Sequence, residues 1–247
     1  MKIKCGLALL ASLVLVAGCS QSPSSSSRTA AESVSAPAPV AQEHKLGTAW
    51  GEDVVSKVTT VDATRVRQSP DSVAKVLYSA APSSHGQYTN EIVLSSVRMR
   101  VQTEHNRDFA LNRYKSGEFS FSANDGERYQ LFFYNTSPSK TYEVVTAVDG
   151  LDVISGRRGS LRNSGYLVSP KGTLVIEGFR KSDSSVAAFR FAKPDDSYAA
   201  SSLAGEIENT GVIGVAVYEM AKPGLPDCQP QAFPGDSQYA PAPCKKK

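Results

Sequence analysis

The sequence predicts an all-β protein, an antiparallel β-sandwich with a barrel as the alternative and one or two short helices. Apolar and polar residues alternate through most of the stretch from Ala49 to about Met220, and this period of two is typical of strands with one buried face. Turn-forming residues separate these runs about every 10–15 residues, with no long helical pattern between them. These observations favour stacked or closed antiparallel sheets over a helical architecture.

Each predicted strand places apolar side chains on one face. In "EFSFSAN", Phe119 and Phe121 alternate with Glu118, Ser120 and Ser122. The same alternation runs through "RMRVQTE", "RYQLFFYN", "TYEVVTAV", "TLVIEGF" and "SVAAFRF". The last run, "GVIGVAVYE", is apolar on both faces, which predicts a central strand.

Turn signals lie between the predicted strands. Residues 124–126 ("NDG"), 135–139 ("NTSPS") and 170–172 ("PKG") each separate two runs. Asp149 and Gly150 directly follow "TYEVVTAV". We expect Asp149 to open a hairpin turn, because Asp-Gly is a preferred turn pair.

Helical patterns are few. Residues 69–80 ("SPDSVAKVLYSA") carry apolar residues at helical spacing after a serine and a proline, which predicts a helix. Residues 195–205 ("DDSYAASSLAG") predict a second helix, with Asp196 or Ser197 as its N-cap and Gly205 as its stop.

Residues 51–66 ("GEDVVSKVTTVDATRV") fit two structures. Val54, Val58 and Val61 have helical spacing, whereas the many valine and threonine residues favour a strand. We expect a strand that begins at about Lys57.

The chain begins with the features of a secretory leader. Lys2 and Lys4 supply positive charge, and residues 6–17 form an apolar run that ends in small residues. A helix that spans a bilayer needs about 20 residues, so this run is too short for a permanent anchor. We expect residues 1–18 to be a signal peptide that is removed.

Val16-Ala17-Gly18-Cys19 resembles the lipobox of bacterial lipoprotein precursors. The resemblance implies that the Cys19 sulfur receives a diacylglycerol, that the leader is cut between Gly18 and Cys19, and that the new amino group is acylated. The three acyl chains that result, two on the diacylglycerol and one on the amino group, would anchor the protein to a membrane without a spanning helix. Ser20 follows the cysteine, which in the enteric pattern resembles an outer-membrane more than an inner-membrane destination.

The rest of the chain divides into three parts. Residues 19–46 are rich in Ser, Ala and Pro and predict a disordered tether, because they carry too little apolar surface to fold. Residues 47–221 are expected to form the β-sandwich domain, and residues 222–247 a proline-rich tail outside the sheets. Cys228 and Cys244 lie in this tail. They are candidates for a disulfide, because removal of Cys5 with the leader and acylation of Cys19 would leave these two cysteines to pair in an exported chain.

The charge excludes one class of partner. The formal net charge is +3, and loss of Lys2 and Lys4 with the leader leaves +1. Hydrophobic residues make up 40% of the chain and charged residues 21%, which is ordinary for a globular protein. We therefore expect no nucleic-acid partner for the mature protein.

A long stretch of the chain resembles an uncharacterised family of bacterial proteins. The shared motifs are, in order, "VDGL", "GY", "GFR" with a following serine, "AAFRF" and "GVIGVA", within residues 129–219. The resemblance implies one compact β-rich unit. It supplies no activity and no catalytic residue.

Motifs for catalysis are absent from the sequence. His44, His85 and His105 are far apart, and neither an HExxH nor a Cys-x-x-Cys motif occurs, so no metal is expected. Without a G-x-S-x-G turn or a glycine-rich phosphate loop, no cofactor is expected either. Asp195 and Asp196 are expected to start a helix rather than to form a catalytic pair.

Residues 155–165 ("SGRRGSLRNSG") form the most suggestive binding motif. Arg157, Arg158 and Arg162 lie among glycines and serines. Guanidinium groups beside exposed backbone N–H groups can hold a carboxylate or a phosphate. The alternative, which we favour, is a solvated loop whose charges keep the protein soluble.

Together these features predict a lipid-anchored protein of the bacterial cell envelope. We expect it to act as a non-catalytic binding or structural module. Its partners would be the membrane, through acyl chains on Cys19, and an envelope protein or polymer. The alternative is an enzyme that hydrolyses an envelope polymer with residues drawn from separate loops.

Overall fold

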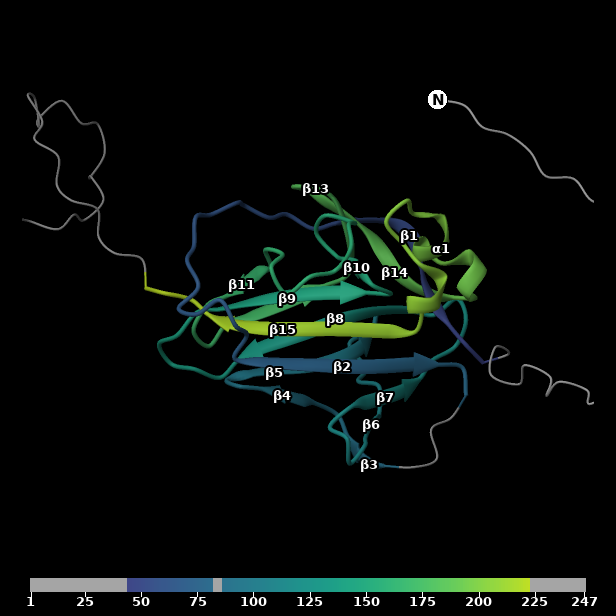
Figure 1. The fold of residues 1–247 in the computed structure, drawn as a ribbon, viewed down its shortest axis with the longest axis horizontal. Helices are drawn as coiled ribbons and strands as arrows, with labels where there is room; N and C mark the ends of the chain where they lie inside the picture. The colour runs from purple at the N-terminus through teal and green to yellow at the C-terminus, as the bar shows by residue number, and fades with distance from the viewer. Residues whose placement is uncertain (1–43, 82–85, 223–247) are drawn as a thin grey trace, which may run out of the picture. The chain divides into compact units, whose positions relative to one another are not determined.

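The computed structural model describes residues 44–81 and 86–222, and within them two β-sheets pack together as a β-sandwich (Figure 1). This confirms the predicted fold class. The helices of the described residues are short: α1 (Tyr198–Ser201) and two 3-10 turns, Pro194–Asp196 and Ile207–Asn209. None of the helices in these ranges is long and apolar enough to cross a membrane.

The first sheet has seven strands in the order β1-β14-β8-β5-β4, with β12 paired to β8 and β13 paired to β14. All its pairings are antiparallel. Its strands are β1 (Gly47–Val55), β4 (Ile92–Leu94), β5 (Val97–Thr103), β8 (Arg128–Asn135), β12 (Thr173–Ile176), β13 (Gly178–Ser182) and β14 (Ser185–Ala192).

The second sheet has eight strands in the order β10-β9-β15-β2-β7-β6-β3, with β11 paired to β9. Only the β2–β7 pair among the described strands is parallel. The predicted central strand is confirmed, since β15 lies between β9 and β2 (Figure 1). The strands are β2 (Ser72–Ser79), β3 (Gln87–Thr89), β6 (Leu111–Arg113), β7 (Phe119–Ser122), β9 (Tyr142–Val148), β10 (Leu151–Asp152), β11 (Tyr166–Val168) and β15 (Val212–Glu219).

The core lies between the two sheets and is built from the alternating apolar residues. From the second sheet, Val144 and Val217 are fully buried; from the first, Tyr129, Phe189 and Phe191 are buried. The Tyr129 ring stacks on Phe191 with 4.2 Å between the ring centroids. The burial of apolar and aromatic side chains such as these is the main favourable contribution to the free energy of folding.

The prediction of a helix over residues 69–80 is wrong, because this stretch contains β2. Ala74, Val76 and Tyr78 are buried, whereas Val73 is 57% exposed, so burial follows a period of two. The strand is bonded on both sides, to β15 and to β7. Pairing with two neighbours outweighs the helical spacing of the valines.

The prediction of a strand from Lys57 is also wrong. β1 runs from Gly47 to Val55, and its last residue pairs with Ser185, the first residue of β14. Residues 56–64 have no regular secondary structure, since the partner strand has ended. We call residues 56–64 the connecting segment, because they lead from the first sheet to the second (Figure 1).

The local signals at two turns are confirmed. Ser197 is the N-cap of α1, as predicted, and accepts a hydrogen bond from the Ala200 N–H at 3.1 Å. However, α1 covers only Tyr198–Ser201 of the helix predicted over residues 195–205, so the prediction that Gly205 ends it is wrong. Asp149 and Gly150 form the two-residue turn between β9 and β10, with φ values of 52° and 78°. Two positive φ values in a two-residue hairpin are typical of a type I′ turn.

Candidate functional site

Two adjoining cavities lie between the connecting segment and β11, an edge strand of the second sheet. One has a volume of about 520 Å³ and is named here the Arg180 cavity. The other has a volume of about 640 Å³ and is named the Lys140 cavity. Both are in the range of small-molecule sites. Four residues line both of them, so we refer to the two as the paired cavities: Val61, Ala63, Leu167 and Met220.

The connecting segment is held at its two ends. At the first end, the Ser56 and Val58 N–H groups donate to carbonyls of the β13–β14 turn, each at 2.8 Å. At the other end, the Thr64 carbonyl accepts from the Ala221 N–H at 2.8 Å. Between them, residues 59–63 make no backbone hydrogen bond to any described residue. The segment therefore passes over the paired cavities fixed only by its ends.

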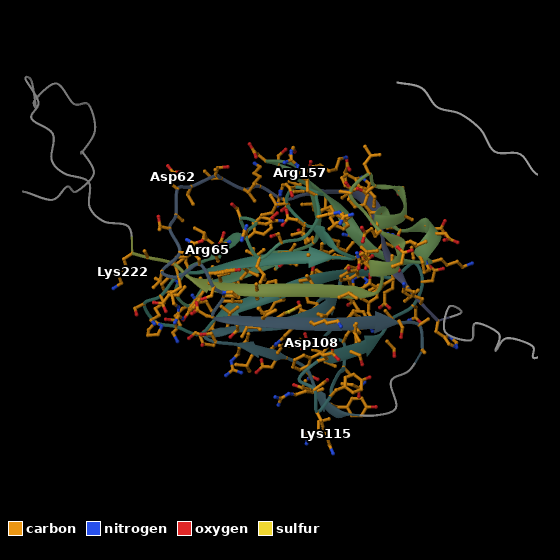
Figure 2. All side chains as sticks on the ribbon, viewed as in Figure 1. Asp62, Arg65, Asp108, Lys115, Arg157 and Lys222 are labelled. Carbon is orange, nitrogen blue, oxygen red and sulfur yellow. The ribbon has the colours of Figure 1, made fainter. Side chains whose placement is uncertain are left out.

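Arg65 fixes the second end of the connecting segment. Its Nε donates to the Glu143 carboxylate at 2.5 Å, and the side chains of this pair are only 12% and 8% exposed. The guanidinium lies 3.8 Å from the Tyr218 ring centroid and also donates to the carbonyls of Leu161 and Asn163. Figure 2 shows Arg65 and Lys222 at the same end of the sheets as Asp62.

Arg180 brings a positive charge to the Arg180 cavity. Its Nε donates to the Tyr166 hydroxyl at 2.9 Å, and its terminal nitrogens donate to the carbonyl and hydroxyl of Ser56 and the carbonyl of Ser182. All these acceptors are uncharged. Within the described ranges no carboxylate lies within ion-pair distance of this guanidinium. Its charge is therefore unbalanced at short range.

The other two charged residues of the Arg180 cavity differ from Arg180. Glu143 is neutralised by Arg65. Asp183 lies in the exposed turn after β13, and its carboxylate makes no hydrogen bond or ion pair to a described residue. Arg180 is the more buried of the two unpaired charges, so it is the less screened by water.

The floor of the paired cavities is apolar and joins the core. Ile154, Tyr166 and Leu174 line the Arg180 cavity and are partly buried against the main hydrophobic cluster. Leu167 and Met220 continue this floor into the Lys140 cavity. Burial also raises the pKa of the Tyr166 hydroxyl, so this group stays protonated at neutral pH. The arrangement combines an apolar surface with one cation, which suits an amphipathic ligand.

A buried polar cluster links the two sheets near the β9–β10 turn. The Asp149 carboxylate accepts hydrogen bonds from the N–H groups of Thr48 at 2.6 Å and Gly211 at 2.8 Å, and from the Tyr78 hydroxyl at 2.7 Å. The Thr48 hydroxyl is 2.7 Å from the hydroxyls of both Tyr78 and Tyr129. A carboxylate only accepts, so the donors run from Tyr129 through Thr48 and Tyr78 to Asp149.

Burial changes the pKa values in this cluster. It raises the pKa of Asp149 to about 6, although the hydrogen bonds to the carboxylate act in the opposite direction. Burial and the nearby Asp149 charge raise the pKa values of Tyr78 and Tyr129 well above their ordinary value. Asp149 borders a small cavity of about 210 Å³ with Arg158 and Glu206.

The predicted lipidation and disulfide residues lie outside the described residues: Gly18, Cys19, Cys228 and Cys244. The arginines of the candidate anion-binding loop lie in an exposed stretch, with Arg157 at the surface (Figure 2). Arg158 forms an ion pair with Glu206, so its charge is already balanced. The structure does not place Arg157, Arg158 or Arg162 in the paired cavities.

The remaining candidates from the sequence are scattered. His44 and His105 are exposed, and His85 lies outside the described residues. No group of three His, Cys, Asp or Glu side chains in the described ranges could hold a metal ion. Asp195 and Asp196 lie in the 3-10 turn before α1, which Ser197 caps.

Sequence reasoning missed Arg180 and Asp149 as members of polar clusters. The "GFRKS" and "VDG" motifs that contain them were visible, but their partners lie far away in the chain. Comparison of the chain with family models, with curated proteins and with solved structures finds no match. The site is therefore defined by its own geometry.

Proposed function

We propose that this chain is a lipid-anchored protein of the bacterial cell envelope that binds a small ligand in the paired cavities without converting it. The membrane anchor is proposed from the leader and the Val16–Cys19 motif. The binding role is proposed from one observation, an apolar floor joined to the core beneath a segment fixed only at its ends. Such a segment can move aside without disrupting either sheet.

The anchor is tested by labelling cells with an alkyne analogue of palmitate. The natural chain and Cys5→Ala should incorporate the label, because Cys5 lies within the leader. Cys19→Ala should lose the label and keep the mass of residues 1–18. Label on Cys19→Ala, or none on the natural chain, would disprove acylation at Cys19.

The binding role is tested by native mass spectrometry of the anchored protein purified from envelopes. Ala63 lies on the exposed connecting segment and lines both cavities, so Ala63→Trp should fill them. Ala200→Trp is the matched control, because Ala200 is exposed on α1 and lines neither cavity.

A retained small molecule should be found on the natural chain and on Ala200→Trp, and it should be lost from Ala63→Trp. Equal retention by all three proteins would place the ligand elsewhere. Absence of any retained molecule from all three would count against the binding role.

A further inference from the structure

We propose that the ligand of the paired cavities is a fatty acid, whose carboxylate pairs with Arg180 and whose chain lies over Leu167 and Met220. This inference rests on the proposed function and names the class of ligand. It follows from two features of the same site, an unbalanced guanidinium and an extended apolar floor.

The cation side of the site is built by Arg180. The hydrogen bonds to Tyr166 and Ser56 hold the guanidinium in place before a ligand arrives. Its Nε has one hydrogen, which is donated in the hydrogen bond to the Tyr166 hydroxyl. One terminal nitrogen donates to two carbonyls and the other to the Ser56 hydroxyl alone. That second nitrogen has two hydrogens, so one donor is left for a ligand oxygen. A preorganised guanidinium beside apolar walls favours a carboxylate over a neutral group.

The apolar side of the site leads away from Arg180. Ile154 and Leu174 lie in the Arg180 cavity, and Leu167 and Met220 extend the floor into the Lys140 cavity. An unbranched chain with the carboxylate at one end would cover this floor. Each methylene group removed from water would add to the affinity.

The charged groups of the second cavity favour the same orientation. Lys140 is paired with Glu219 at 2.8 Å. Asp62 and Lys222 line this cavity with opposite charges (Figure 2). Neither has an ion-pair partner within the described ranges, but both are exposed, so water screens their charges more than that of the partly buried Arg180, which we therefore take as the group that sets the direction of the ligand.

Asp183 opposes the proposed ligand and provides a sharp test. It lines the Arg180 cavity, and its exposed carboxylate has no partner within the described ranges. Its negative charge should weaken binding of an anion. Asp183→Asn removes this charge without removing a contact, so it should strengthen binding, whereas loss of Arg180 should weaken it.

The experiment uses photoreactive dodecanoate and photoreactive dodecanol with the anchored protein in nanodiscs. Labelled peptides are mapped by mass spectrometry. Dodecanoate should label the peptides that contain Leu167 and Met220, at least about tenfold more than dodecanol. Unlabelled dodecanoate should compete, and Ala63→Trp but not Ala200→Trp should abolish labelling.

The charge variants then test the role of Arg180. Arg180→Met should reduce dodecanoate labelling about tenfold and leave dodecanol labelling unchanged. Asp183→Asn should increase dodecanoate labelling about twofold, the size expected for an exposed charge. Because Arg180→Met also removes the side-chain hydrogen bonds to Ser56, its folding is checked by thermal unfolding. The exposed Asp183→Asn variant gives an independent result.

Two outcomes would overturn the fatty-acid assignment. Equal labelling by dodecanoate and dodecanol, both removed by Ala63→Trp, would reject the role of the carboxylate and leave the binding function standing. Labelling outside the paired cavities would reject the site for fatty acids, and the native mass spectra would then decide the binding function on their own.

Discussion

Asp149 combines three roles at one position. Its φ of 52° makes the turn between β9 and β10, and its carboxylate ties β1 and the residue before β15 to that turn. Its hydrogen bond from Tyr78 also closes the hydroxyl chain that begins at Tyr129. The carboxylate is buried and paired only with neutral donors, so its ionisation is costly.

Asp149→Asn should change the pH dependence of stability. Burial raises the pKa of Asp149 from 3.8 to about 6, so the folded protein holds this proton over a range where the unfolded chain has lost it. The stabilisation from this group is full below about pH 4 and is lost as the pH rises through 6, about 3 kcal/mol in all. The free energy of unfolding of the natural chain, relative to Asp149→Asn, should fall by that amount from about pH 3 to pH 8.

The measurement is urea unfolding of both proteins followed by the fluorescence of Trp50, the single tryptophan. Asparagine does not titrate, so it isolates the contribution of residue 149. A difference between the two proteins that stays constant with pH would show that Asp149 titrates normally.

Thr48→Val should lower the free energy of unfolding more in the natural chain than in a chain that already carries Tyr129→Phe. The single change leaves the buried Tyr129 hydroxyl without its acceptor, at about 1–3 kcal/mol. The second change removes that unpaired hydroxyl, so the double variant should lose less than the sum of the two singles. A double-mutant cycle in urea measures the coupling, and additivity within about 0.5 kcal/mol would contradict it.

Among the strands, two glycines differ in the space around them. A Cβ at Gly178 in β13 would lie 1.9 Å from the Ala187 carbonyl oxygen of β14, whereas one at Gly214 in β15 would have nothing within 4 Å. The first glycine allows two strands to approach closely. The second lies in the apolar outer face of the second sheet, beside Val145 and Ala216.

Gly178→Ala and Gly214→Ala should therefore have opposite effects. The first should destabilise the protein by at least about 1–3 kcal/mol, because the backbone of β13 or β14 must shift. The second should be neutral or stabilising by up to about 1 kcal/mol, because it restricts only the unfolded chain. Thermal unfolding of both variants gives the test. Equal losses of stability would contradict the finding that a Cβ has room at Gly214 but not at Gly178.

Most strands could be predicted from the sequence, because inward side chains recur at every second residue. In β5, Val97, Met99 and Val101 are fully buried, whereas Arg98 and Arg100 between them are partly exposed. Residues 69–80 predict a helix, because their apolar residues have helical spacing. The same residues also fit a strand, whose neighbours come from distant parts of the chain. Strand pairing is decided by such partners, which no local window contains.

The paired cavities could not be predicted, because their walls come from distant segments. Val61, Leu167 and Met220 meet only after both sheets have formed. Arg180 carries no local sign that its partners would be Tyr166 and Ser56. The charged loop at residues 155–165 attracted attention because its arginines are close together in sequence, whereas Arg180 stands apart from other arginines in the chain.

For the whole molecule, the connecting segment joins the two sheets and covers the paired cavities. Amide hydrogen exchange should be fast in residues 59–63, which make no backbone hydrogen bond to a described residue, and slower at Val58 and Val66, whose N–H groups are bonded. Exchange measured by NMR tests this arrangement. Uniform protection across residues 56–66 would contradict a segment fixed only at its ends.

The most direct test of the binding site is a crystal structure of the protein with dodecanoate. The account predicts electron density for the carboxylate beside Arg180 and for the chain over Leu167 and Met220. Density for dodecanoate at another surface, with ordered water in both cavities, would contradict it.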